Sequence, residues 1–276
     1  MKLNKLAVCA LSGIMLAGAV MAADEAPKEA EKEERSAWIP SLELSLDHTS
    51  RYMSEGNVGN PDHITTIGLT AEWSITENFA VHGGGVAIYD GTDACGNDDN
   101  VEEWDWLAGF TFSIPEVAGI GTLEFNFDYI YYNYPRDKDH NYTADTKEYE
   151  IDVNATDLFL SPGIAFVHDF ENDIIKGNVN ATYEQKLTKI SEQLSFECPV
   201  ELWCGNHQYT GSTRHTAVYS LCIQPTLKYE INEHFSIGAY AQMGWAIDGS
   251  VRRDWKEDEN NNAFNVCWGL NLTVNF

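Results

Sequence analysis

The last thirteen residues of the chain, Phe264-Asn-Val-Cys-Trp-Gly-Leu-Asn-Leu-Thr-Val-Asn-Phe276, alternate between large apolar side chains and small or polar ones. Successive side chains of a β-strand point to opposite faces of its sheet, whereas a helix repeats about every 3.6 residues. This period of two therefore predicts a strand with one apolar face and one polar face.

The same alternation recurs upstream and predicts nine further strands. The ten predicted strands fall at 42–47, 67–75, 79–89, 104–112, 123–131, 158–166, 175–184, 219–229, 235–245 and 264–276. Short links follow strands two, four, six and eight, and long polar links follow the odd-numbered strands. Bacterial outer-membrane barrels combine an even strand number with short turns at one end and long loops at the other. We therefore predict an all-β fold for residues 38–276, a transmembrane antiparallel up-and-down β-barrel of ten strands, with eight or twelve as alternatives.

Two prolines conflict with the predicted strands. Pro162 and Pro225 both fall inside one, and a closed barrel offers no free edge where a missing N–H is harmless. Pro162 indicates a bulge, or a strand that starts later than 158. Pro225 lies near a strand end, where it is tolerated.

The composition agrees with a barrel and excludes other classes. The 276 residues carry a formal net charge of -26, with 12% aromatic residues and a mean hydropathy of -0.32. Nucleic-acid binding needs a basic face, and a bundle of membrane helices needs long apolar runs. A membrane barrel needs neither, because the apolar side chains that face lipid and the polar side chains that face the lumen alternate, so the mean hydropathy of a strand stays moderate.

The N-terminus predicts export. Residues 1–22 combine two early lysines, an apolar run and a small-residue cleavage pattern, which is typical of a secretory signal peptide. A single anchor helix is the alternative. Residues 23–37 form a charged, Ala-rich stretch, which we interpret as a periplasmic leader. The predicted location is the bacterial outer membrane.

Two segments resemble a known family. Ser45-Leu-Asp-His-Thr-Ser-Arg-Tyr-Met-Ser-Glu-Gly56 is similar to the first hairpin of the TorF-like porins of Gram-negative bacteria, although Glu55 stands where that family has an arginine. Asp128-Tyr-Ile-Tyr-Tyr-Asn-Tyr-Pro135 is similar to a mid-chain strand of the same family. The resemblance implies a porin without a particular solute. Phe276 resembles the terminal aromatic of outer-membrane barrels, which implies the barrel-assembly machinery as a partner.

The polar strand faces predict the lining of the lumen, where acids outnumber bases. This inward set is Glu43, Asp47, Arg51, Glu72, Asp105, Glu124, Asp128, Glu184, Lys186 and Lys228. A wall of this charge favours cations, so we predict passive passage of small cationic or neutral polar solutes. A closed structural or surface-interaction barrel is the alternative, because internal pairing of these charges leaves no open lumen.

Cysteines and histidines offer weaker signals. In an oxidising compartment, Cys198 and Cys204 are close enough in sequence to predict a local disulfide, while the pairing of Cys95, Cys222 and Cys267 stays open. A zinc site from Cys198, Cys204 and His207 lacks a fourth ligand. An outer-rim hydrolase is a further alternative, with candidates His140, His207, His215, Ser212, Asp137, Asp139 and Asp145. We predict no enzyme activity, cofactor or metal.

Overall fold

The computed structural model describes residues 39–91, 101–134, 145–210, 216–257 and 262–276. The predicted signal peptide (1–22) and leader (23–37) lie outside these residues, as does Cys95. In the part of the chain that is described, no helix is long and apolar enough to cross a membrane.

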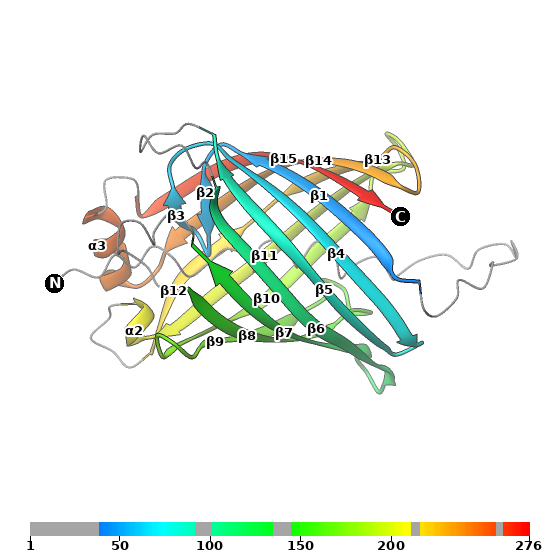
Figure 1. Ribbon diagram of the computed structural model, residues 1–276, viewed down its shortest axis with the longest axis horizontal. Coiled ribbons are helices and arrows are strands. Elements are labelled where there is room, and N and C mark those ends of the chain that lie inside the picture. Colours follow the sequence, from blue (N-terminus) through cyan, green and yellow to red (C-terminus); the bar gives the residue numbers. More distant parts are fainter. Residues whose placement is uncertain (1–38, 92–100, 135–144, 211–215, 258–261) are drawn as a thin grey trace, which may run out of the picture.

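Antiparallel strands close into one barrel (Figure 1). The wall strands are β1 (Ser41–Thr49), β4 (Ile64–Thr76), β5 (Phe79–Asp90), β6 (Val101–Val117), β7 (Gly121–Asn133), β8 (Thr146–Ala155), β9 (Gly163–Asp169), β10 (Ile174–Lys186), β11 (Leu194–Asn206), β12 (Thr216–Ile223), β13 (Thr226–Glu230), β14 (Phe235–Ala246) and β15 (Phe264–Asn275). β12 and β13 share one position between β11 and β14, so the wall has twelve strand positions. β15 closes it by pairing with both β14 and β1. A closed wall leaves no unpaired strand edge, as a membrane requires.

The two ends of the barrel differ. Tight links join β4 to β5 and β6 to β7 at one end, which we call the turn end. β1, β5, β7, β11 and β14 end at the other end, the loop end, which carries α2 (His207–Thr210) and α3 (Gly249–Glu257) (Figure 1). In outer-membrane barrels short turns face the periplasm and long loops face the exterior.

The prediction of ten strands is wrong, and the alternative of twelve is confirmed. The missed strands, β8 and β11, lie inside links that the sequence predicts as loops. β8 carries Glu148, Glu150 and Asp152 along one face, which makes its sequence resemble a polar loop, and Pro199 interrupts the sequence pattern of β11. Because β8 reverses the chain direction, the short link 170–173 lies at the loop end and not at the turn end.

The prolines fit the observed strands. Pro162 precedes β9, so that strand does start later than predicted. Pro225 lies in the break between β12 and β13. Pro199 sits opposite this break, where its carbonyl accepts the backbone N–H of Gln224 at 3.1 Å. The chain thus places its strand prolines where the wall pairing already changes.

The outward face of the wall is apolar, as the alternation predicts. Large apolar side chains exposed on it include Leu44, Leu69, Trp106, Phe110, Ile151, Val179, Leu202, Ile237, Trp268 and Leu270. An exposed apolar band around a closed barrel would be costly in water and is matched by the hydrocarbon of a bilayer. The wall is therefore that of a transmembrane barrel.

Candidate functional site

The first long link does not stay outside the barrel but folds into its lumen. It forms a separate hairpin of β2 (Tyr52–Ser54) and β3 (Asn57–Asn60) (Figure 1). Met53 and Val58 on this hairpin pack with the inward-facing Cys267 of β15, and all three are buried. The hairpin therefore lies against the β15 side of the wall.

The tip of the hairpin is held by a cluster that we call the Glu55 latch, made of Glu55, Lys176, Tyr209 and Tyr219. The Glu55 carboxylate lies 2.8 Å from the Lys176 ammonium of β10, and the two side chains are only 1% and 2% exposed. Its other oxygen accepts hydrogen bonds from the phenol of Tyr209, at 2.7 Å, and from that of Tyr219. Because β10 lies across the barrel from β1, the latch joins opposite sides of the wall.

Local backbone geometry explains why the tip reaches this position. Glu55 and Gly56 both have positive φ, 49° and 84°, as in the tight two-residue turns that match the strand twist. A Cβ at Gly56 would lie 2.9 Å from the Cα of Gly244, so only glycine fits between the hairpin and β14. The amide of Asn265 donates to the carbonyl of Gly56 at 3.1 Å and fixes the tip along β15.

A β-bulge aims Tyr219 at the latch. The pairing of β11 with β12 shifts between Trp203 and Cys204, which leaves Tyr219 as the extra residue on β12. Alternation alone would point Tyr219 away from the neighbouring inward residue Ser220, yet both are buried. Bulges commonly redirect one side chain in this way.

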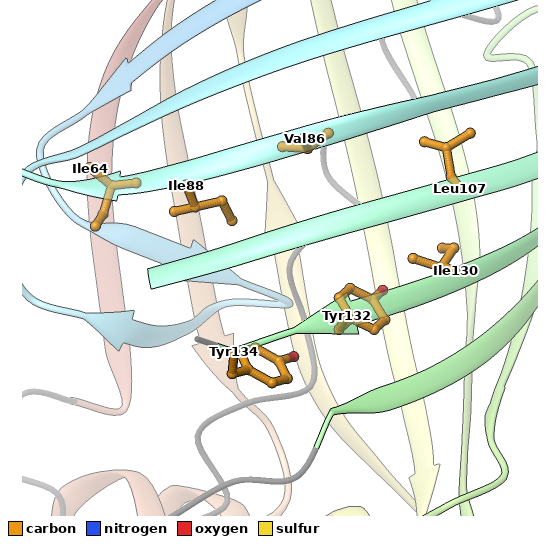
Figure 2. Packing of buried hydrophobic residues seen from close by; sticks show 7 residues of the cluster. All are labelled: Ile64, Val86, Ile88, Leu107, Ile130, Tyr132 and Tyr134. Atoms are coloured by element: carbon orange, nitrogen blue, oxygen red, sulfur yellow. The ribbon is translucent and has the colours of Figure 1, made fainter. Parts of the chain in front are cut away.

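A second surface of the lumen, on β4 to β7, is apolar. Figure 2 shows its side chains in a band across these strands: Ile64, Val86, Ile88, Leu107, Ile130, Tyr132 and Tyr134. Tyr52 of the hairpin packs against this cluster. The sequence predicts a polar lumen, so this inward apolar cluster is an observation that alternation did not supply. With the hairpin, it occupies part of the loop-end half of the lumen.

Acidic side chains line the same half, next to the apolar cluster. We call Asp105, Glu148, Glu150 and Asp152 the acid wall; they face inward from β6 and β8. Glu148 accepts a hydrogen bond from the Tyr132 phenol at 3.2 Å and lies 3.7 Å from Lys176. Asp128, on β7 between them, is paired with His82 at 2.6 Å.

The turn-end half of the lumen is more open. Glu43, Asp47, Glu124 and Lys228 face inward there and are half-buried. Lys228 lies within electrostatic range of Glu43, Glu184 and Glu197, and Asp47 accepts a hydrogen bond from the Tyr240 phenol at 2.7 Å. This half forms a polar vestibule.

The predicted lumen residues are thus split between two regions. Glu43, Asp47, Glu72, Glu124, Glu184 and Lys228 belong to the vestibule, whereas Asp105 and Asp128 belong to the buried loop-end half. Arg51 lies on the link between β1 and β2, and Lys186 is exposed at the turn end of β10. The latch was missed, because nothing local in the sequence pairs Glu55 with Lys176 or Tyr219.

The predicted disulfide between Cys198 and Cys204 is wrong. Both are free thiols on the outward face of β11. Six residues of extended strand span about 20 Å, whereas a disulfide needs Cα atoms within about 7 Å. Cys222 and Cys267 are not bonded to each other, and β14 separates their strands.

Most candidate residues of the hydrolase alternative lie outside the part of the chain that the structure describes. His140, His215, Ser212, Asp137 and Asp139 lie outside the described residues. His207 begins α2 at the loop end, and Asp145 accepts a hydrogen bond from the Tyr131 phenol at 2.7 Å. In the described ranges, no three His, Cys, Asp or Glu side chains converge as metal ligands.

Comparison with family models and with curated proteins finds no match. Among solved structures, the chain is similar to an outer-membrane channel from Pseudomonas putida, at 9% identity and a TM-score of 0.48, covering 91% of this chain and 100% of that one. It is also similar to outer membrane phospholipase A from Escherichia coli, at 6% identity and a TM-score of 0.47, covering 86% and 92%. A third is the KdgM porin in complex with disordered oligogalacturonate, at 8% identity and a TM-score of 0.45, covering 86% and 99%. At these values the likeness assigns no family, and the resemblance to TorF-like porins stays a prediction.

Proposed function

We propose that this chain is an outer-membrane channel for passive passage of small polar solutes, and that the hairpin closes its loop-end half in this structure. The observation that carries the proposal is a closed barrel whose apolar exterior suits lipid and whose turn-end half is a half-exposed polar vestibule. The hairpin forms a sheet of its own and is not paired with the wall strands; it is held by the Glu55 latch and by the buried contacts of Met53 and Val58. Displacing such a segment from the lumen costs far less free energy than opening a wall strand.

The charge of the lumen favours cationic or neutral solutes. In the vestibule, Lys228 is surrounded by acids, including Glu43, Glu184 and Glu197. A charged wall of one sign in a low-dielectric barrel concentrates ions of the opposite sign. A conducting form is therefore expected to be cation-selective.

A closed surface barrel is the second candidate, and the packing of the loop end favours it. Trp255 and Val251 of α3 are buried with Trp203, Tyr219 and Ala246, so the loop-end helices also cover the lumen. If these contacts never open, the barrel conducts nothing and the loop end serves to bind partners.

Planar-bilayer recordings on refolded protein separate the two functions. We would compare the wild type with a variant in which residues 51–61 are replaced by a short Gly-Ser link that removes the hairpin. The channel proposal predicts larger and more frequent cation-selective currents from the variant. A variant that folds, as shown by its β-rich circular dichroism, but stays silent would establish the closed barrel.

A further inference from the structure

The acid wall combines carboxylates that the described residues do not neutralise. Asp105 is 1% exposed, and neither of its carboxylate oxygens has a hydrogen-bond donor among the described residues. The ionisable side chains that act on it are two more acids, Glu103 and Glu148. One oxygen of Glu148 also lacks a hydrogen bond within the described ranges.

One lysine faces several acids at this wall. Glu150 lies near the charges of Asp152, Glu148 and Asp128, and Lys176 is the base that opposes them. Lys176 is already engaged by Glu55 at 2.8 Å. Burying carboxylates in this way is costly unless a positive group from elsewhere pairs with them. The wall therefore has the charge of a binding site for a cation.

The spacing of the acids favours an extended cation over a metal ion. Glu148, Glu150 and Asp152 follow one another on the same face of β8, about 6.7 Å apart along the strand. In the described residues these groups do not converge as metal ligands would. Ammonium groups joined by short alkyl spacers can instead meet successive carboxylates in turn.

Apolar side chains interleave with the acids and suit such spacers. In the strand register Glu148 is opposite Ile130, Glu150 is opposite Val167, and Asp105 is opposite Val86. All three apolar partners are buried. Lys176 already illustrates the binding mode, since its buried side chain places an ammonium between Glu55 and Glu148 and over the Tyr209 ring, 5.5 Å from the ring centroid.

We propose that the acid wall binds a linear di- or polyamine, whose ammonium groups pair with Asp105, Glu148 and Glu150. Asp152 is half-buried at the vestibule end of the row, so a cation that enters from the turn end meets it first. The inference rests on the proposed function, because it names the solute class that would occupy the lumen.

Calorimetric titration of spermidine into the full-length refolded barrel in detergent micelles tests this proposal. Saturable binding is expected for the wild type, and D105N and E150Q should each weaken it about tenfold to hundredfold, the value of a hydrogen bond to a charged group. E233Q removes the same charge from the exposed link between β13 and β14, away from the lumen, and should leave binding unchanged. Since D105N removes an unpaired buried charge, it should fold at least as well as the wild type.

Three results would overturn the proposal. They are the absence of saturable spermidine binding to the wild type, equal binding by D105N, E150Q and E233Q, and displacement of spermidine by an equal concentration of magnesium. The titration needs no conductance, so a barrel that binds spermidine but stays silent in bilayers would contradict the channel and leave this inference standing.

Discussion

Lys176→Met tests the latch most directly, because it leaves the Glu55 carboxylate buried without its cation. At 2.8 Å and an effective dielectric of about 20, the attraction in this pair is about 6 kcal/mol, most of which offsets desolvation of the two groups. Removing one partner of a buried pair costs about 3–5 kcal/mol. Since about 1.4 kcal/mol is a tenfold change, the population with the hairpin inside should fall by about two to three and a half orders of magnitude relative to the population with it outside.

The double variant Glu55→Gln with Lys176→Met separates the ion pair from general damage to the fold. It removes both charges, and the phenols of Tyr209 and Tyr219 still have an amide oxygen to donate to. Replacing a buried pair by neutral groups is often close to neutral in stability. The open probability of the double variant should therefore be far lower than that of Lys176→Met. It should exceed that of the wild type by no more than about tenfold.

Open probability in planar bilayers measures the effect, with circular dichroism as the check on folding. The matched control is the pair Lys147 and Glu171 at the loop end, which lies 2.6 Å apart but is 39% and 35% exposed. Exposed pairs contribute about 0–1 kcal/mol, so K147M with E171Q should conduct like the wild type. The reasoning fails if Lys176→Met leaves the open probability unchanged, or if the double variant opens as much as the single one.

Four further predictions follow from the fold. Val58→Cys should form a disulfide with Cys267 on mild oxidation, because both side chains belong to one buried cluster; peptide mapping that finds both thiols free would place the hairpin elsewhere in solution. Gly109→Ala should destabilise the barrel by about 1–3 kcal/mol, because its Cβ would come within 2.6 Å of His82 Nε2 and closer still to Asp128. Thermal unfolding in detergent measures this, and Gly249→Ala, with no atom within 4 Å, is the control that should not shift the midpoint. Leu69→Lys, on the outward face of β4 and 52% exposed, should cost about 2–4 kcal/mol in lipid, whereas Ile190→Lys in a turn-end link should cost little; equal unfolding midpoints in vesicles would argue against the membrane assignment. Phe276→Ser should slow insertion in cells but not refolding in vitro, and unchanged insertion would remove the predicted role of this residue in the barrel-assembly machinery.

Several features of the barrel follow from side-chain alternation alone. The strict period of two over Phe264–Phe276 predicts β15 and its lipid-facing side, and the same signal predicts the inward orientation of Glu43, Asp105 and Lys228. These features are local, because a strand fixes which side of the sheet each side chain faces. Alternation does not predict β8, because the acidic side chains of this wall strand make its sequence resemble a loop. It does not predict β11 either, because Pro199 interrupts the pattern.

The state of the lumen depended on contacts between residues far apart in the chain. Glu55 stands out in the sequence only as a departure from a family pattern, and Lys176 and Tyr219 are more than a hundred residues away from it. They meet because the barrel closes, because the first loop folds inward, and because a bulge turns Tyr219 toward the hairpin tip. Alternation therefore determined the wall, its two faces and its suitability for lipid. Only the tertiary structure decided that the first loop enters the loop-end half and that the acids there form a buried row, since sequence periodicity carries no information about which inward side chains meet across the lumen.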